Sequence, residues 1–365
     1  MAIEWRLLDL GELPPITTQA LYHALGLAMD KESTPNTIVF CKPSSPLVCV
    51  GYHQEVYEKV NVAYCLSKGY PIVRRIVGGG VVYLDQNQLF YQVIARKSDP
   101  RVPSSITALF ERFLAAPVKT YNRLGIPATH YAVNDIEVNG RKIGGSGAGD
   151  VGEARIVVGD IIFDFNYDEM TSILKAPSMR FKEEFSKALT EYLTTVKKEL
   201  GFIPSEEEVK KLLKEGFEET LGVRLIEGAL SGFEVNLVRE VEELYKSPDW
   251  LHRAKRHGKS IVKRNSVKIS GRVRMGEALY RRPKGLIRVF VKVVDGKISS
   301  LTITGSLVPR VYLDALKNRL EGVQFSEAAI IQRINDFYED HEIPLKEVTP
   351  EDLAYIIVKA AGEGD

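Results

Sequence analysis

The sequence is poor in cysteine and carries almost no net charge. Its 365 residues include three cysteines, Cys41, Cys49 and Cys65, all in the first fifth of the chain. Three thiols cannot pair completely, and no C-x-x-C spacing occurs, so the sequence supports neither a disulfide framework nor a zinc knuckle. We therefore expect reduced, mostly buried thiols and a cytoplasmic protein.

Long apolar runs are also absent. No stretch approaches the roughly 20 residues that span a bilayer, and the N-terminal segment, with Glu4 and Asp9, lacks the pattern of a signal peptide. The 49 basic and 48 acidic side chains nearly cancel, so the chain as a whole attracts neither nucleic acid nor anionic membrane. We expect no nucleic-acid or membrane partner, and any anion must be bound at a local site.

Other missing patterns argue against several kinds of functional site. The six histidines show no spacing typical of metal ligands, and no G-x-S-x-G sequence supports a serine hydrolase. The basic run from Arg253 to Arg264 lacks interleaved aromatic residues, which is more typical of a solvated linker than of a nucleic-acid site.

Strand-like and helix-like segments alternate through the first half of the chain. Asn139-Gly140 is its strongest hairpin signal, and residues 85–87 form a second turn between two strand-like runs. Prominent hairpins without regular βαβ repeats predict an α/β (α+β) fold built on a mixed or largely antiparallel sheet.

The character of the sequence changes towards the C-terminus. Charged helical segments between residues 168 and 246 are expected to complete the first domain. The strands and helices that follow, with a hairpin turn at Asp295-Gly296, predict a smaller α+β domain. We therefore predict a larger domain over 1–250, a basic linker over 251–264 and a second domain over 265–365. The sequence carries no oligomer signal, so a monomer is expected.

The first glycine-rich segment, RRIVGGGVVYLD, begins at Arg74. Gly78, Gly79 and Gly80 can adopt positive φ and place no side chain between the backbone and a ligand. Successive N–H groups in such a turn can bind an anion. Arg74 and Arg75 alternate across the preceding strand, so one of them can clamp a phosphate or carboxylate. On spacing alone, a turn with solvated arginines fits equally well.

The second glycine-rich segment, NDIEVNGRKIGGSGAG, begins at Asn134. Lys142 follows its hairpin turn and is flanked by glycines that include Gly145. Such a lysine can place its ammonium on a phosphate oxygen and stabilise the charge that develops there during acyl-adenylate formation. The alternative is a hairpin lysine in water. Asn134 and Asp135 can hold the ribose or a magnesium ion, with Asp135 as the metal ligand, or can simply form a turn.

Together the two segments resemble the lipoate–protein ligase family, which shares its fold with biotin–protein ligases. The family pattern R-R-x-x-G-G-G-x-V-x-H-D corresponds to residues 74–85, and N-D … G-x-K-[IV]-x-G corresponds to 134–135 and 140–145. Residues 301–325 are similar to the accessory domain of two-domain ligases. The resemblance covers nearly the whole chain and implies a catalytic domain with a mixed, biotin/lipoate ligase-like sheet and a smaller C-terminal accessory domain.

The resemblance also implies roles for the matching residues. Arg75 would contact the nucleotide phosphate, and Lys142 would bridge the lipoyl carbonyl and the phosphate. ATP with Mg²⁺ would convert lipoate or octanoate to acyl-AMP, and a lysine of a carrier protein would take the acyl group. The expected carriers are the lipoyl domain of a 2-oxoacid dehydrogenase and a glycine-cleavage H-type protein. The groove for the adenylate would be lined by Gly80, Val81, Val82 and Tyr83.

Departures from the family pattern cluster around this expected groove. Leu84 replaces the usual histidine of the first motif. Val158-Gly159-Asp160 stands where the family usually has H-G-T, and residues 192–196 stand where it has R-V-T-N-L. These changes concern the acyl substrate or the acceptor more than the reaction class.

Other functions fit the same fold. An octanoyl- or lipoyl-transferase that works through an acyl-cysteine needs a thiol near the lysine, and no cysteine follows Cys65. A non-catalytic lipoyl- or nucleotide-binding homologue would account for the missing histidines but not for the retained Arg75, glycines and Lys142. A biotin ligase is disfavoured because no G-R-G-R-type loop is present. We therefore predict an ATP-dependent, AMP-forming lipoate–protein ligase.

Overall fold

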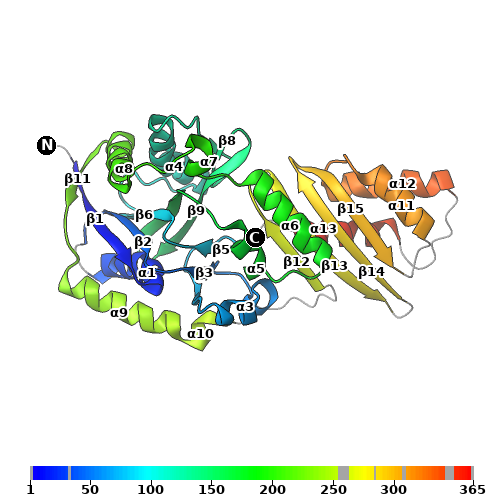
Figure 1. The fold of residues 1–365 in the computed structure, drawn as a ribbon, viewed down its shortest axis with the longest axis horizontal. Helices are drawn as coiled ribbons and strands as arrows, with labels where there is room; N and C mark the ends of the chain where they lie inside the picture. The colour runs from blue at the N-terminus through cyan, green and yellow to red at the C-terminus, as the bar shows by residue number, and fades with distance from the viewer. Residues whose placement is uncertain are drawn as a thin grey trace. The chain divides into compact units, whose positions relative to one another are not determined.

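The computed structural model describes residues 3–31, 34–253, 263–282, 285–305, 310–341 and 349–362. The chain divides into two units, Met1–Leu174 with Leu193–Ala254 and Lys175–Tyr192 with Lys255–Asp365 (Figure 1). The strands of the first unit are β1 (Ile3–Leu13), β2 (Thr37–Pro43), β3 (Leu47–Val50), β4 (Ile72–Arg74), β5 (Val81–Leu84), β6 (Gln88–Arg96), β7 (Thr129–Tyr131), β8 (Asp135–Val138), β9 (Arg141–Val151), β10 (Ala154–Ile162) and β11 (Val223–Glu227). Its helices are α1 (Pro15–Lys31), α2 (Val56–Lys59), α3 (Val62–Ser67), α4 (Ile106–Arg123), α5 (Tyr167–Ile173), α7 (Val196–Leu200), α8 (Glu206–Leu221), α9 (Gly232–Lys246) and α10 (Pro248–Leu251).

A mixed sheet with the strand order β11-β1-β2-β6-β10-β9-β8-β7 forms the centre of the first unit. Strand β1 is parallel to β11 and β2, and the other neighbours are antiparallel. Helices α4 and α8 share a core with one face. The other face packs against α1, α9 and the small sheet β4-β3-β5. The predicted α/β fold with a mixed sheet is confirmed.

Strands β5 and β6 are joined by the predicted turn at residues 85–87 but do not pair with each other. Both edges of β6 are already taken by β2 and β10, so β5 pairs with β3 in the small sheet instead. The turn thus carries the chain from the small sheet to the central sheet. This crossing places the glycine-rich segment before β5 on one face of the central sheet.

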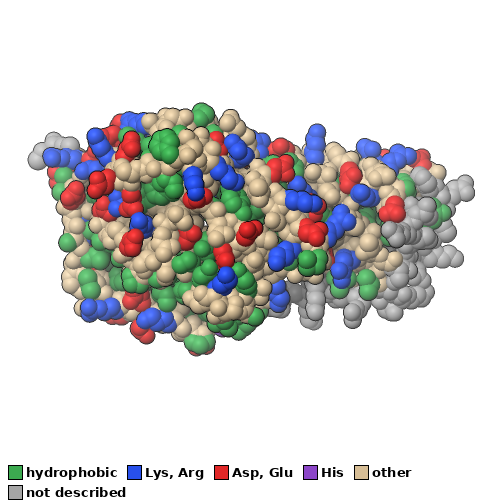
Figure 2. Space-filling view, viewed as in Figure 1, with side chains coloured by type: hydrophobic (Ala, Val, Ile, Leu, Met, Phe, Trp, Pro, Cys, Tyr) green, Lys and Arg blue, Asp and Glu red, His purple; other side chains and the backbone are tan. Residues whose placement is uncertain are grey.

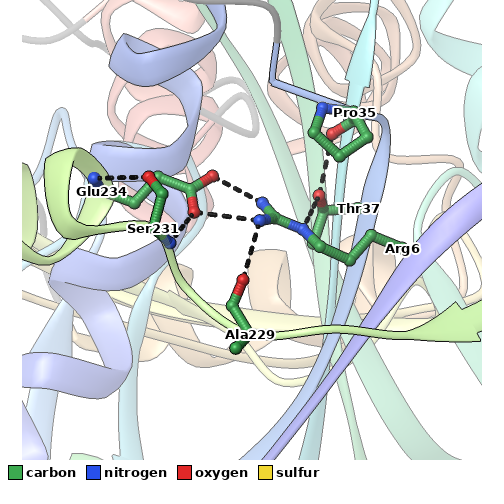
Figure 3. Close-up of polar contacts among 6 residues, drawn as sticks. All are labelled: Arg6, Pro35, Thr37, Ala229, Ser231 and Glu234. Carbon is green, nitrogen blue, oxygen red and sulfur yellow. Dashed lines mark hydrogen bonds and ion pairs between the residues drawn. The ribbon is translucent and has the colours of Figure 1, made fainter.

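Helix α9 is held against the sheet by a buried charge. Arg6 on β1 donates to the Glu234 carboxylate, with its Nη2 2.6 Å from Oε1, and to the carbonyl of Ala229 (Figure 3). Its Nε lies 3.1 Å from Thr37 Oγ1. Glu234 also closes a capping box with Ser231 at the start of α9. One carboxylate therefore caps the helix and fixes it to β1.

The second unit is built on an antiparallel sheet in the order β12-β13-β14-β15. Its elements are β12 (Lys263–Lys268), β13 (Val273–Arg282), β14 (Gly285–Val294), β15 (Lys297–Gly305), α6 (Met179–Tyr192), α11 (Arg310–Leu320), α12 (Glu327–His341) and α13 (Pro350–Ala361). Asp295 and Gly296 join β14 to β15 with φ of 48° and 74°, which confirms the predicted hairpin turn. Helices α11, α12 and α13 bury one face of this sheet.

Helix α6 belongs to the second unit, although the sequence analysis placed it in the first domain. The Phe181 ring packs edge-on against Phe290, with centroids 6.3 Å apart, and the Ser178 hydroxyl lies 2.6 Å from a Glu277 oxygen. An amphipathic pattern shows that a helix buries one face but not which sheet it covers. The predicted linker over 251–264 lies largely outside the described residues, and the catalytic and accessory roles of the units remain predictions.

Basic and acidic side chains are mixed on the face of the molecule that Figure 2 shows. The two kinds are interspersed over both units, as the near-zero net charge suggests. Among the helices described, none has the length and apolar character needed to cross a membrane.

Candidate functional site

The two glycine-rich segments meet on one face of the central sheet. A Cβ at Gly147 would lie 3.1 Å from Val77 Cγ2, and a Cβ at Gly149 would lie 3.4 Å from Val77 Cγ1. Residues two apart in a strand share a face, so the alternating glycines of β9 let the loop over residues 75–80 lie directly on this strand. The loop and the strand that carries Lys142 therefore form one surface.

The Arg75 guanidinium holds the glycine loop by hydrogen bonds to its carbonyl oxygens. Its Nη2 lies 2.8 Å from the Gly78 carbonyl oxygen and 3.0 Å from that of Gly80, and its Nη1 lies 3.3 Å from the carbonyl oxygen of Cys49. In the part of the chain that the structure describes, none of the N–H groups of residues 78–80 donates a backbone hydrogen bond. Arg75 thus engages the loop carbonyls, and the N–H groups remain available for an anion.

Arg74 points away from Arg75, as strand alternation predicted, but it does not reach the loop surface. Its side chain is 1% exposed. The indole Nε1 of Trp250 donates to the Arg74 carbonyl at 2.9 Å. Every Arg74 donor atom is engaged with the backbone, which gives this side chain a structural role, and its contact with a ligand remains a prediction. The guanidinium donates to the carbonyls of Gly51, Tyr52, Trp250 and Leu251.

Lys142 lies at the start of β9, directly after the confirmed Asn139-Gly140 turn. Its Nζ is 2.7 Å from Oδ1 of Asp135, whose side chain is 1% exposed, whereas that of Lys142 is 21% exposed. Gly145 makes room for the ammonium, because a Cβ there would lie 3.0 Å from Lys142 Nζ. Lys142, Asp135 and Gly145, which were predicted as site residues, are thus neighbours.

Two other predicted segments also border Lys142. Asn134 Nδ2 lies 2.5 Å from the Ser146 carbonyl oxygen, so Asn134 ties β9 to the chain before β8. Thr194 N–H donates to the Lys142 carbonyl at 2.8 Å, and Leu193 forms a β-bridge with Lys142. The resemblance predicts that this segment, residues 192–196, borders the substrate groove, and the two contacts place its residues 193 and 194 beside Lys142.

A magnesium role for Asp135 remains a prediction. Within the described residues, no group of three His, Cys, Asp or Glu side chains is arranged to hold a metal ion, and Asp135 is used by Lys142. Magnesium in nucleotide sites is held largely by the phosphates and water. In the structure Asp135 is the partner of Lys142, and its role toward magnesium stays a prediction.

Asp160 contacts the predicted site residue Gly145, although the sequence analysis recorded it only as a departure from H-G-T. From β10 its Oδ1 accepts the N–H of Gly145 at 3.1 Å. Burial raises the pKa of Asp160 to about 6, the Gly145 N–H and the Lys142 charge lower it in part, and Asp135 raises it. The signal in the sequence was an ionisable residue in a strand position of the expected groove.

The raised pKa of Asp160 predicts a pH-dependent stability. Ionisation costs stability as the pH rises from the ordinary aspartate pKa near 4 to about 6, and this cost is absent at lower pH. We expect Asp160→Asn to increase the free energy of unfolding by up to roughly 3 kcal/mol at about pH 7.5 and by little at about pH 3.5. Urea unfolding at both pH values measures this. Asp150→Asn is the control with the opposite sign, because hydrogen bonding to Arg155 lowers the pKa of Asp150; a destabilised Asp160→Asn at pH 7.5 would contradict the assignment.

The apolar departures also lie together. Leu84 belongs to the core cluster on the loop side of the sheet, and Val158 and Val82 pack against the same cluster. Both positions where the family usually has histidine are therefore apolar here and adjoin one cluster. Tyr83 is 4% exposed and packs against Tyr70, whereas Val81 and Val82 are partly exposed. The valines, more than Tyr83, can contact a ligand.

The three thiols are free and fully buried, as expected. Burial raises the pKa of Cys41 to about 12 and that of Cys65 to about 11. Burial also raises the pKa of Cys49, although Arg75 opposes the shift. A thiol of raised pKa in an apolar core is a poor nucleophile, so none of them is placed for acyl transfer.

Comparisons with known proteins agree with this geometry. Residues 14–218 match the family model of the lipoyl protein ligase A/B catalytic domain, and residues 280–357 match that of the bacterial lipoate protein ligase C-terminus. Among curated proteins, the octanoyltransferase LipM of Kyrpidia tusciae is 26% identical over 272 residues, which cover 68% of this chain and 98% of that protein.

Solved structures of ligases are similar as well. The bi-partite lipoate protein ligase of Thermoplasma acidophilum, from a study that includes its E2 lipoyl domain, is 26% identical with a TM-score of 0.62 and covers 71% of this chain and 100% of that one. A lipoate-protein ligase A bound with ATP is 26% identical with a TM-score of 0.57, covering 68% and 99%. The chain thus belongs to the lipoyl protein ligase A/B family.

Proposed function

We propose that this chain is an ATP-dependent lipoate–protein ligase. It forms lipoyl-AMP or octanoyl-AMP and transfers the acyl group to a lysine of a lipoyl domain. The observation that carries the proposal is the shared surface of the glycine loop and Lys142. Gly147, where the loop lies on β9, is two residues from Gly145, beside which the ammonium lies, a separation of about 7 Å along a strand.

This surface suits an acyl adenylate. In the first step a carboxylate oxygen of the acid attacks the α-phosphorus of ATP, and pyrophosphate leaves. The loop N–H groups and the Lys142 ammonium then face the phosphate on which charge develops, and donors fixed before the reaction stabilise that charge without reorganising. Magnesium would arrive with ATP and neutralise the departing pyrophosphate. Arg75 acts by holding the loop in shape.

In the second step the amine of the acceptor lysine attacks the acyl carbon, and AMP leaves. Lys142 polarises the acyl carbonyl, and partly exposed Val81 and Val82 provide an apolar border for the acyl chain. The acceptor is a lipoyl domain, a proposal supported by the similar ligase studied with its E2 lipoyl domain. A glycine-cleavage H-type protein offers the same chemistry, a lysine presented on a small carrier.

An octanoyltransferase is the second candidate, and the LipM relatives favour it. A transferase of the acyl-cysteine type needs a reactive thiol. The sequence has only three cysteines, all buried with raised pKa. The match of residues 280–357 to a ligase C-terminus also supports the ligase.

The intact mass of a lipoyl domain separates these functions. We expect a mass gain of one lipoyl group after incubation with this protein, lipoate, ATP and magnesium, and none when ATP is omitted. An octanoyltransferase would instead modify the domain from octanoylated carrier protein without ATP. No mass gain from either donor, with folded protein, would indicate a binding homologue and refute the ligase proposal.

The glycine loop allows a sharper test of where the nucleotide binds. A Cβ at Gly80 would meet no atom within 4 Å, whereas Gly79 has φ of +99° and a Cβ there would lie 2.6 Å from Arg75 Nη2. We expect Gly80→Ala to change stability by less than about 0.5 kcal/mol but to weaken ATP binding at least tenfold, because the methyl group occupies the space of the ligand.

Calorimetric titration with ATP and thermal unfolding measure these two effects. Gly79→Ala is the matched variant, and we expect it to destabilise the protein by about 1–3 kcal/mol through backbone strain. ATP affinity unchanged in Gly80→Ala would show that the nucleotide binds elsewhere.

A further inference from the structure

Acyl transfer to a lysine requires a base. The side chain of a lysine has a pKa of about 10.4, so the acceptor arrives as an ammonium and must lose a proton before its nitrogen can attack. We propose that Asp160 accepts this proton, an inference that rests on the proposed ligase function. The Asp160 carboxylate takes the proton, the freed nitrogen attacks the acyl carbon, the bond from that carbon to the phosphate oxygen breaks, and AMP leaves as the amide forms.

The position of Lys142 limits which groups can be the base. Lys142 holds the acyl carbonyl, and the attacking nitrogen must come within about 3–3.5 Å of the carbonyl carbon. A base must then lie within one hydrogen bond of that nitrogen, or one water away. Of the described carboxylates near the Lys142 ammonium, Asp135 is ion-paired with it at 2.7 Å, Glu137 is its cross-strand neighbour and is 2% exposed, and Asp160 interacts with its charge.

Asp135 and Asp160 differ in exposure and in partners. Asp135 is 1% exposed and ion-paired with Lys142 at 2.7 Å, so its carboxylate is already paired with a positive charge. Asp160 is partly exposed, and the Gly145 N–H donates to its Oδ1 at 3.1 Å. Asp160 is therefore the carboxylate that an incoming lysine can reach.

The charged and polar groups that interact with Asp160 shift its pKa in both directions. They are Lys142 and the Gly145 N–H from β9, Asp135 from β8, and the phenols of Tyr91 on β6 and Tyr121 on α4. The phenol of Tyr91 contacts the Ser146 hydroxyl, and that of Tyr121 donates to the Ile143 carbonyl, so both phenols are held in place. Burial already raises the Asp160 pKa to about 6, and the negative phosphate of a bound adenylate would raise it further.

The residue type also distinguishes this chain from the pattern that it resembles. Where the family usually has the threonine of H-G-T, this chain has Asp160. A threonine hydroxyl donates a hydrogen bond but does not take up a proton near neutral pH. This chain thus has a base at the position where the usual pattern has a hydroxyl.

The test uses chemically prepared lipoyl-AMP and a lipoyl domain, so that transfer is measured without adenylation. Single-turnover transfer is followed from about pH 5 to pH 10 for the wild type, Asp160→Asn and Asp160→Thr. We expect both variants to transfer at least a hundredfold more slowly near pH 7 and to lose the acid limb of the wild-type profile. The deficit should narrow near pH 10, where the acceptor amine deprotonates unaided. Lipoate-dependent pyrophosphate exchange should stay within about threefold of wild type.

Asp150→Asn is the matched control, because Asp150 lies on the strand next to β10 and pairs with Arg155 at an exposed site. Its transfer rate and pH profile should equal those of the wild type. Unchanged transfer in Asp160→Asn would overturn the proposal, as would a parallel loss of transfer and exchange, which would show that Asp160 only positions Lys142. Asp160→Thr provides the same comparison if Asp160→Asn does not fold. A wild type without pyrophosphate exchange would refute the ligase function alone, because transfer from lipoyl-AMP is read separately.

Discussion

Lys142→Met is expected to lower acyl-adenylate formation by about a thousandfold. The ammonium is the single described side-chain cation that lies beside Gly145 on the loop-covered face of β9, and removing a preorganised charge from a phosphoryl transition state costs about 10²–10³ in rate. Methionine fills a similar volume without the charge. Pyrophosphate exchange into ATP, measured with and without lipoate, gives the rate directly.

The same substitution has a structural cost that must be separated from its effect on chemistry. It removes the ammonium 2.7 Å from Asp135, a carboxylate that is 1% exposed, and breaking a buried pair in this way costs about 3–5 kcal/mol. The double variant with Asp135→Asn removes the uncompensated charge, so we expect it to regain most of the stability and none of the activity. Near-normal exchange in the double variant would show that Lys142 does not act on the phosphate.

An exposed lysine offers the matched control. Lys197 pairs with Asp164 at 2.6 Å, but its side chain is 53% exposed, and such surface pairs contribute little. Lys197→Met should therefore leave both exchange and stability near wild-type values. A loss of exchange in this variant as large as in Lys142→Met would indicate a general effect of lost positive charge.

Arg74→Lys is expected to destabilise the protein by about 2–4 kcal/mol and to leave the ATP requirement unchanged. The planar guanidinium serves carbonyl oxygens on two separate segments, residues 51–52 and 250–251, with the shortest contact 2.6 Å from Tyr52 O. A lysine ammonium cannot reproduce that fork, and each buried carbonyl left unpaired costs about 1–3 kcal/mol. Urea unfolding gives the loss of stability.

The ATP dependence of exchange distinguishes this structural role from nucleotide binding. If Arg74 bound the nucleotide, Arg74→Lys would raise the KM for ATP markedly while stability changed little, and that outcome would contradict the structure. Arg123→Lys is a suitable control because Arg123 lies at the exposed end of α4 and pairs with Glu219. It should change stability by less than about 0.5 kcal/mol.

The hairpin turns and the alternating direction of side chains along a strand were predictable from the sequence, because both depend on residues that are neighbours in the chain. Asn139-Gly140 and Asp295-Gly296 form the expected hairpins with positive φ, because few residue pairs adopt that backbone easily. Alternation also indicated that Arg74 and Arg75 point to opposite faces. It did not indicate that both guanidinium groups bind backbone carbonyls, since the acceptors of Arg74 include residues about 176 positions away.

For the candidate site, too, some features follow from the sequence and others only from the tertiary structure. The sequence by itself determined which residue types could meet an acyl phosphate: three glycines, an arginine and a lysine in a recognisable order. Only the tertiary structure decided that the loop rests on the glycines of β9, that α6 packs in the second unit, and that the Asp160 carboxylate accepts the Gly145 N–H and interacts with the charges of Lys142 and Asp135. The physical reason is that burial, charge and close approach depend on which strands become neighbours, and long-range strand pairing is not encoded in any single segment.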